Sequence, residues 1–196
     1  MIKFSRRWAM PNKNTFNCAP IHEFVQRYIN HFKPIVDSFC GENPFVLIHS
    51  NDMNPDKPTN HHLDAVEFLK KMKKDHFKLG LFDPPYSLRQ CKECYEGMGK
   101  KLTHADTLDA SFRRVKDELD PLIVEGGIVL SFGWNTVGMG KKKGYEIVEI
   151  MLVSHGGHHQ DTICTAEYKI HNDLEKERKA RAFLAKTVLS EKVLDL

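Results

Sequence analysis

The chain has 196 residues, a formal net charge of +3 and a hydrophobic fraction of 41%. This length allows a single domain with a buried core, and this composition excludes a disordered, collagen-like or low-complexity chain. The five cysteines, an odd number, indicate reduced thiols in an intracellular compartment.

The apolar runs of the sequence are short. The longest are Phe45–Ile48, Leu122–Val124 and Ile128–Leu130, whereas a membrane-spanning helix needs roughly 20 apolar residues. The segment Met1–Arg7 lacks the apolar core of a signal peptide. We therefore expect a soluble, cytoplasmic protein with no membrane partner.

The N-terminal part of the chain predicts an irregular segment, a helix and two strands. Pro and Asn residues interrupt the first twenty residues, which we expect to be irregular. Apolar residues from Ile21 to Phe32 recur with the helical period and predict an amphipathic helix. The apolar runs Pro34–Asp37 and Phe45–Ile48 predict two short strands.

The middle of the chain predicts two helices and a buried strand. Thr59 or Asn60 is expected to cap the first helix, whose apolar face comprises Leu63, Val66, Leu69 and Met72. The run Leu79–Phe82 predicts the strand. Periodic apolar residues from Leu108 to Leu119 predict the second helix, which Pro121 ends.

The C-terminal part predicts three strands, Ile128–Phe132, Tyr145–Val153 and Thr162–Ile170, followed by a charged helix from about Asp173. Strands that are continuous apolar runs and alternate with helices indicate an α/β fold. We expect a mostly parallel sheet with helices on both faces, and the last two strands as an antiparallel hairpin at one edge. Ligands of such sheets bind beyond the carboxyl ends of the strands.

The loop Asp83-Pro84-Pro85-Tyr86 follows the predicted strand Leu79–Phe82. The two prolines stiffen the loop and remove two amide donors, which leaves backbone carbonyls available as acceptors. Asp83 and the Pro84 carbonyl suit the two N–H bonds of an exocyclic amine, and Tyr86 suits the ring that carries the amine. The alternative interpretation is a proline-rich turn that only ends the strand.

This loop resembles the catalytic motif of S-adenosylmethionine-dependent amino methyltransferases, most typically the N6-adenine DNA methyltransferases. The segment Asp37-Ser38-Phe39-Cys40-Gly41 resembles their cofactor loop. The segments Arg7–Asn12, Gly133-Trp134-Asn135 and His155-Gly156-Gly157 resemble small phage- and prophage-associated members. The resemblance implies a Rossmann-like methyltransferase fold and the cytoplasm of a bacterial or phage-infected cell.

The resemblance also implies the site residues. It assigns catalysis to Asp83, Pro84, Pro85 and Tyr86, with S-adenosylmethionine as the cofactor. It assigns cofactor contacts to a second set of residues, which comprises Asp37, Phe39, Gly41 and, near the methionine end of the cofactor, Thr15 and Phe16. An ordinary exit from a strand is the alternative interpretation of Asp37, Phe39 and Gly41.

Asp52 is a further candidate because it follows the second predicted strand. An acid at such a position binds ribose hydroxyls in dinucleotide sites. Alternatively, Asp52 forms an Asx turn before Pro55.

Four residues are candidates for contacts with the substrate. Trp134 and Asn135 follow the strand Ile128–Phe132, where an exposed aromatic ring could stack on a displaced base, although Trp134 could equally be a core residue. His158 and His159 lie in the predicted hairpin loop and could position a nucleotide or simply be exposed. Lys141–Lys143 could contact phosphates or form a solvated loop.

A zinc site is an alternative use of the cysteines and of some of the 11 histidines. Its ligands would come from Cys91 and Cys94, which form a CxxC, and from His155, His158, His159 and Cys164. Cys91 and Cys94 are expected on one helical turn, and no second CxxC accompanies them. We therefore expect no metal.

The principal hypothesis is methyl transfer to the exocyclic N6 of adenine in DNA, after the base has been flipped out of the helix. The same chemistry on cytosine N4, RNA adenine or a protein glutamine is an alternative. A non-catalytic nucleic-acid-binding module or a zinc-dependent module is an alternative from another class.

Residues 1–196 are expected to form a single catalytic domain without a separate target-recognition domain. Only Ser87–Asp106 and Asn135–Gly144 are long enough to serve as insertions. We therefore expect a loose or very short sequence preference, to which a homodimer or a partner protein could add contacts.

Overall fold

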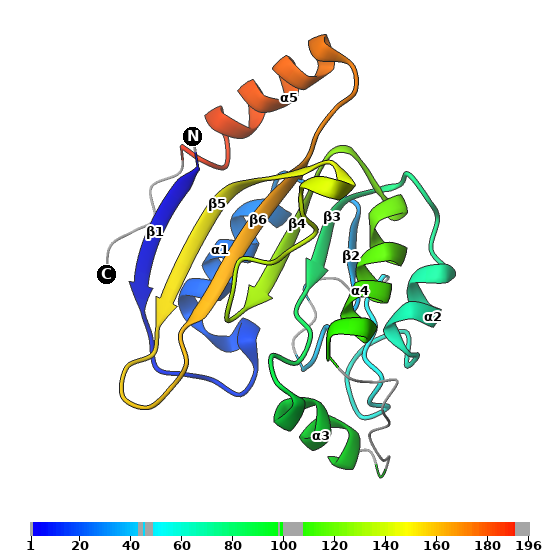
Figure 1. Cartoon of the computed structure of the whole chain (residues 1–196), viewed down its shortest axis with the longest axis vertical. Coiled ribbons are helices and arrows are strands. Elements are labelled where there is room, and N and C mark those ends of the chain that lie inside the picture. Colours follow the sequence, from blue (N-terminus) through cyan, green and yellow to red (C-terminus); the bar gives the residue numbers. More distant parts are fainter. Residues whose placement is uncertain (1, 43–44, 46–48, 98, 100–107, 191–196) are drawn as a thin grey trace.

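The computed structural model describes all residues except 1, 43–44, 46–48, 98, 100–107 and 191–196. Its centre is a six-stranded sheet with the order β1-β5-β6-β4-β3-β2 (Figure 1). The strands are β1 (Lys3–Trp8), β2 (Ile35–Asp37), β3 (Phe77–Phe82), β4 (Ile123–Gly133), β5 (Tyr145–Ser154) and β6 (Thr162–Lys169). Within this sheet β6 runs antiparallel to both neighbours, and the other pairs are parallel.

Helices lie on both faces of the sheet (Figure 1). The helices are α1 (Ala19–Ile29), α2 (Ala65–Lys70), α3 (Leu88–Gly97), α4 (Leu108–Leu119) and α5 (Leu174–Lys186). Short 3₁₀ turns are η1 (Thr15–Asn17), η3 (Asp120–Leu122) and η4 (Lys141–Lys143). Figure 1 shows α1 behind the sheet and α2 and α4 in front of it. The α/β fold with a mostly parallel sheet is therefore confirmed.

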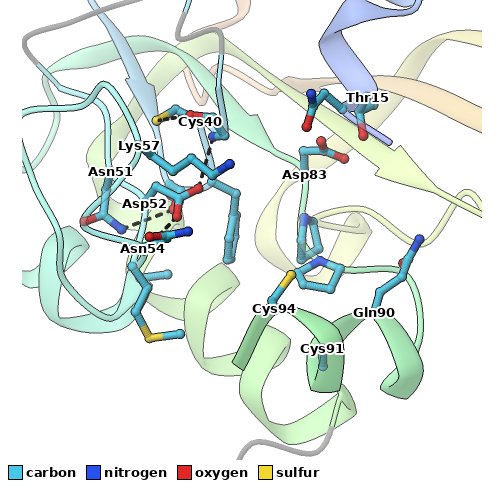
Figure 2. Close-up of a pocket in the computed structure, with 18 of the residues that line it drawn as sticks. Thr15, Cys40, Asn51, Asp52, Asn54, Lys57, Asp83, Gln90, Cys91 and Cys94 are labelled. Atoms are coloured by element: carbon cyan, nitrogen blue, oxygen red, sulfur yellow. Dashed lines mark hydrogen bonds between the residues drawn. The ribbon is translucent and has the colours of Figure 1, made fainter. Parts of the chain in front are cut away.

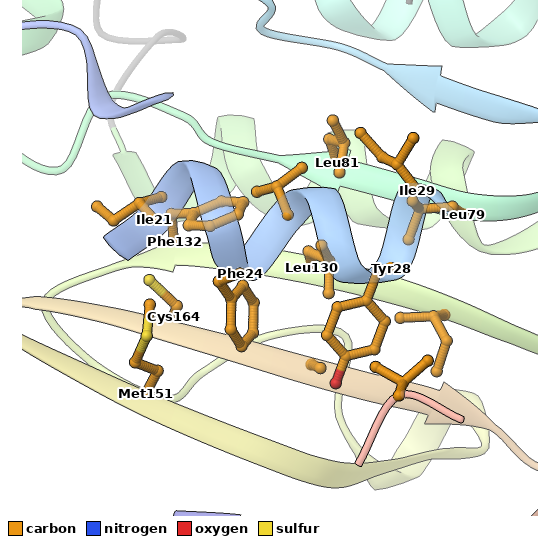
Figure 3. Close-up of a cluster of buried hydrophobic side chains, with 14 of the residues drawn as sticks. Ile21, Phe24, Tyr28, Ile29, Leu79, Leu81, Leu130, Phe132, Met151 and Cys164 are labelled. Carbon is orange, nitrogen blue, oxygen red and sulfur yellow. The ribbon is translucent and has the colours of Figure 1, made fainter. Parts of the chain in front are cut away.

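Two apolar clusters hold the helices on the sheet. In the first, Ile21 and Phe24 of α1 pack against Leu130, Phe132 and other buried strand residues (Figure 3). In the second, α2 and α4 pack on the opposite face, and the cluster includes Val66, Phe68, Leu69, Val115 and Leu119. Full burial of one large apolar side chain stabilises the fold by roughly 1.5–3 kcal/mol.

The expectation of an irregular N-terminal segment is wrong for Lys3–Trp8, which forms β1 parallel to β5. Its apolar residues, Phe4 and Trp8, are exposed, whereas Lys3 and Arg7 turn toward α1 and the acids on that side. In most strands the apolar side chains are buried and the charged ones exposed. Lys3–Trp8 has the reverse pattern, so its sequence does not predict a strand. Because β1 lies beyond β5, the hairpin β5–β6 is inside the sheet and the expected edge position is also wrong.

The expected cap of α2 is wrong as well. Thr59 shares a hydrogen bond with Ser50, and neither Thr59 nor Asn60 caps the helix. The cap is Asp64, whose side chain accepts hydrogen bonds from the amides of Val66 and Glu67. Of the predicted strand Phe45–Ile48, residues 46–48 lie outside the described residues.

A buried ion pair joins β1, β5, α1 and the C-terminal segment. Glu149 is fully buried and binds Arg27 at 2.8 Å, and the Tyr28 hydroxyl donates to its other oxygen at 2.7 Å. Lys3 approaches Glu149 at 3.6 Å, and Arg27 also donates to the Val188 carbonyl. Charges in such a place are tolerated only when they are paired.

No helix in the described part of the chain is long and apolar enough to cross a membrane.

We predict that Glu149→Ala lowers the free energy of unfolding by about 3 kcal/mol, because it leaves the Arg27 charge without its buried partner. Glu175→Ala is the control. Its pair with Lys179 is exposed on α5, so the loss should stay below about 0.5 kcal/mol. Urea unfolding followed by circular dichroism measures both, and equal losses for the two variants would contradict the prediction.

Candidate active site

The loop Asp83–Tyr86 leaves the carboxyl end of β3 and is fixed by hydrogen bonds as well as by its prolines. The Tyr86 hydroxyl donates to Asp83 Oδ1 at 2.6 Å and lies 3.2 Å from the Thr15 hydroxyl. The Tyr86 amide donates to Gln90 Oε1 at 2.6 Å, at the start of α3. Asp83 is therefore oriented by the Tyr86 hydroxyl, and Tyr86 is itself held by Thr15 and Gln90.

Burial changes the acidity of both side chains. It raises the pKa of Asp83 to about 6, although hydrogen bonds from Tyr86 and Thr15 oppose the shift. Burial and the nearby Asp83 charge raise the pKa of the Tyr86 hydroxyl well above its usual value. At neutral pH Asp83 is therefore mostly an anion, and Tyr86 keeps the proton that it donates.

A cavity of about 570 Å³ runs from this loop along the ends of β3 and β2 (Figure 2). This size is typical of sites for small molecules and cofactors. Nine predicted site residues line it: Thr15, Phe16, Phe39, Gly41, Asp52, Asp83, Pro84, Pro85 and Tyr86. The structure therefore brings the two predicted loops and the Thr15–Phe16 segment to one place.

Gly41 and Asp52 form one wall of the cavity. Gly41 has φ +62°, and a Cβ at this position would meet nothing within 4 Å, so the residue borders open space. The Gly41 amide donates to Asp52 Oδ2 at 3.1 Å, and the Asn54 amide donates to Oδ1 at 2.8 Å. Asp52 thus makes the Asx turn and also lines the cavity, and each oxygen keeps a lone pair for a further donor.

Asp37 does not line the cavity, in contrast to the contact expected for it. It is fully buried, because its backbone is paired both with β3 and with the segment His49–Asn51. Oδ1 accepts a hydrogen bond from the Phe39 amide, but Oδ2 has no partner among the described residues. Burial, together with the charges of Asp83 and Asp52, raises the pKa of Asp37 to about 8.

A second cavity, of about 500 Å³, lies beside the first and contains Trp134, His158 and His159. The Trp134 ring makes an edge contact with Tyr86, with 6.1 Å between the ring centroids. Trp134 is 41% exposed, so the interpretation as a core residue is wrong. The structure does not bring Asn135 to either cavity, because its side chain accepts the Val137 amide in a turn.

A buried acid on β6 anchors the loop between β4 and β5. Glu167 of β6 accepts hydrogen bonds from the amides of Met139 and Gly140, at 2.6 and 2.9 Å. A Cβ on Gly138 would overlap this carboxylate, so a larger residue there would have to displace Glu167 from the two amides. In the same loop Lys143 is paired with Asp117, while Lys141 and Lys142 are exposed.

The described residues contain no group of three or more His, Cys, Asp or Glu side chains placed to hold a metal ion. Cys91 and Cys94 lie on one turn of α3, as expected. His155 is buried, and its ring nitrogens lie 2.9 Å from the Ala9 carbonyl and 2.9 Å from the Thr162 hydroxyl. The proposed ligands of a zinc site are thus not brought together in this part of the chain.

Several residues line the first cavity that were not predicted to do so, among them Asn51, Asn54, Lys57, Asp64, Gln90 and Cys94. Asn51 is buried, and its amide binds the carbonyls of Ser38 and Leu63. Asn51 therefore ties the predicted cofactor loop to the segment before α2. The only signal in the sequence is its position beside Asp52 at the end of an apolar run.

No family model and no curated protein matches the chain. Among solved structures, the crystal structure of the N-methyltransferase NodS from Bradyrhizobium japonicum WM9 is similar, with a TM-score of 0.48. The sequence identity is 9%, over 76% of this chain and 94% of that chain. So distant a likeness carries no conclusion about activity, which must come from the site itself.

We predict that Asp37→Asn reduces the loss of stability at high pH. The raised pKa means that folded Asp37 keeps its proton where the unfolded chain has lost it, so stability falls as the pH rises from about 4 to about 8. Asparagine has no proton to lose. Between pH 6 and pH 9 the Tm of wild type should therefore fall by about 5 °C more than that of Asp37→Asn.

Differential scanning calorimetry provides this measurement. The matched control is Asp56→Asn, which makes the same substitution at an exposed position and should follow wild type. Parallel pH curves for wild type and Asp37→Asn would contradict the burial of an ionisable group at this position.

Proposed function

We propose that the protein is an S-adenosylmethionine-dependent methyltransferase that methylates the exocyclic N6 of adenine in DNA. The observation that carries the proposal is the single cavity that joins Gly41 and Asp52 to the Asp83 carboxylate. A cofactor bound along the wall that Gly41 and Asp52 form would place its reactive end near Asp83. The two loops that resemble the family therefore face the same space.

The first cavity has the polar groups that such a cofactor needs. Asp52 has lone pairs free for ribose hydroxyls, and Gly41 leaves room for the close approach of a ligand. Phe39 lines the cavity and is held by an edge contact with Phe82, so its ring can pack on a flat group. Ser38 also lines the cavity, and its buried hydroxyl has no partner among the described residues. A bound polar molecule would supply one.

The catalytic loop has the groups that hold an amine. Asp83 can accept one N–H bond of the adenine amino group through its carboxylate. The Pro84 carbonyl, which no described amide binds, can accept the other. These bonds aim the nitrogen lone pair away from the loop and toward the cofactor space, and orientation of this kind is a large part of catalysis in direct transfers.

S-adenosylmethionine supplies an activated methyl group when it is bound. A carbon–nitrogen bond forms as the carbon–sulfur bond breaks, and no covalent enzyme intermediate is needed. The amine must then lose one proton. Asp83, with a pKa of about 6 and a hydrogen bond to that N–H, is suited to accept the proton and to pass it to water.

The acid at position 83 and the ring of Tyr86 favour adenine. A base inside a duplex does not reach such a pocket, so the base is flipped out or lies in a single strand. Cytosine N4, RNA adenine and a glutamine amide present the same kind of amine and are the acceptors against which DNA is compared.

We predict that Asp83→Ala and Asp83→Asn each lower methyl transfer at least about 100-fold, because an acceptor for the amine N–H and its proton is lost. The affinity for S-adenosylhomocysteine should not change, since Asp83 contacts the amine and not the cofactor. Mass spectrometry of nucleosides from digested DNA measures transfer, and calorimetric titration measures binding. The control is Glu175→Ala, an exposed acid on α5.

Near-wild-type transfer by Asp83→Ala would remove Asp83 from the reaction. If wild type bound no cofactor, the methyltransferase itself would be excluded, and a non-catalytic module would take its place. Methylation of RNA, cytosine or glutamine in preference to DNA adenine would support methyl transfer but would show that the acceptor is not DNA adenine.

We also predict an acid limb in the pH profile. Because burial raises the pKa of Asp83 to about 6, protonation should lower kcat/KM about tenfold for each pH unit below this value. The transfer rate is measured from pH 4.5 to 8, together with cofactor affinity as the control for unfolding. A flat profile down to pH 5 would contradict an ionised Asp83 in the reaction.

A further inference from the structure

In the described part of the chain, no helix covers the front face of the sheet over β1 and β5. Figure 1 shows α2 and α4 in front of the other half, near β2, β3 and β4, and no described helix in front of β1 and β5. The registers place Arg6 of β1 opposite Leu152 of β5, and Leu152 opposite Ile163 of β6. Residues opposite each other share a face, so these three side chains lie on the uncovered face.

Exposed aromatic rings lie along the same face. Phe4 and Trp8 are 66% and 65% exposed, and they alternate with Arg6 along β1. Trp8 lies against the hairpin loop, because its Nε1 is 3.5 Å from the position of a Cβ on Gly156. Large rings that remain this exposed on a folded chain are typical of binding surfaces.

The uncovered face continues into the candidate active site. The second cavity is lined by Leu152 and Ile163 from this face and by Trp134, which contacts Tyr86 of the catalytic loop. From β3 to β1 there are four strand intervals, which at ~4.8 Å each span about 19 Å. A stacked single strand advances ~3.4 Å per nucleotide, so this distance corresponds to roughly five to six nucleotides.

We propose that a single strand of DNA lies across this face, with bases stacked on Trp134 and Trp8 and with the backbone near Arg6. The proposal rests on the proposed function, because the strand is the one that presents its adenine at Asp83. Aromatic rings that are separated by a polar, cationic surface are the usual platform for unpaired bases.

The polar residues of the surface favour nucleic acid over a second copy of the chain. His158, His159 and Gln160 are exposed around the second cavity, and Arg6 is exposed between the two aromatic residues of β1. Among the described contacts, Arg6 donates a hydrogen bond only through Nε, to the Ser154 hydroxyl. Its other N–H groups can therefore donate to a phosphate. The centre of a dimer interface is instead depleted of charged residues. A duplex would keep its base faces stacked and unavailable to the rings.

The two tryptophans of the chain are Trp8 and Trp134, so intrinsic fluorescence reports on this surface alone. The experiment uses the full chain with S-adenosylhomocysteine and a 12-nucleotide DNA strand containing one adenine, compared with its duplex. In Trp134→Phe, Trp8 is the single emitter. We expect its emission to be quenched as the single strand binds, at the concentrations at which anisotropy of a labelled strand shows saturation.

Affinity provides the second readout. Trp8→Ala should weaken binding of the single strand about tenfold, and Trp8→Phe should restore most of it, since a ring remains for stacking. Arg6→Gln should weaken binding and reduce its dependence on salt. The matched control is Arg178→Gln, which removes the same charge from exposed α5 at the other end of the sheet. The cofactor affinity of every variant serves as the test of folding.

Three results would overturn the proposal. They are unchanged emission of Trp8 at saturating DNA, equal affinity of wild type and Trp8→Ala, and dissociation of a wild-type dimer by Trp8→Ala in sedimentation. If wild type still methylates DNA adenine in any of these cases, the proposed function stands and only the surface is wrong. If wild type binds no cofactor and transfers no methyl group, the proposed function itself fails.

Discussion

Parallel pairing of β2, β3 and β4 is the constraint on which the rest of the molecule depends. The registers align Asp37 with Leu81, and Leu81 with Leu130, so that the three strands end at one edge. The chain leaves this edge in three loops, which carry Gly41, Asp83 and Trp134. Parallel pairing therefore decides that groups far apart in the sequence share one cavity system, and also that the Asp83 charge adds to the burial that raises the pKa of Asp37.

Buried polar atoms in and next to the site have no partner among the described residues, which lowers the stability of the fold. The two apolar clusters compensate for this loss. Asp37 Oδ2 and the Ser38 hydroxyl are buried and unpaired among the described contacts. Each such atom costs about 1–3 kcal/mol. The two clusters, one on each face of the sheet, offset the cost. Of the two residues only Ser38 lines the cavity, and a buried polar atom without a partner in a cavity wall is the expected signature of a surface that binds a ligand.

The sequence predicted elements whose apolar pattern matches their burial. Continuous apolar runs identified β3 and the core of β4, and the helical period identified α1 and α4. The Asp83–Tyr86 loop could be interpreted because its residue types imply its chemistry. β1 was missed because its partners, Glu149 and Glu23, are distant in sequence and reverse its inside–outside pattern. The depth of Asp37, the turn at Asn135 and the second cavity depend on tertiary pairing, which no local pattern contains.

The anchoring of Met139 and Gly140 by Glu167 limits how this molecule can acquire new parts. The β4–β5 loop is anchored near its midpoint, and a side chain at Gly138 would displace the Glu167 carboxylate that anchors it. The loop therefore behaves as two short segments. A recognition module grafted at Gly138, Met139 or Gly140 would displace the buried Glu167 carboxylate. A module grafted at Lys141 or Lys142 would leave the Glu167 hydrogen bonds intact and would project into solvent. The exposed lysines are therefore a point at which the loop can be enlarged without loss of this anchor.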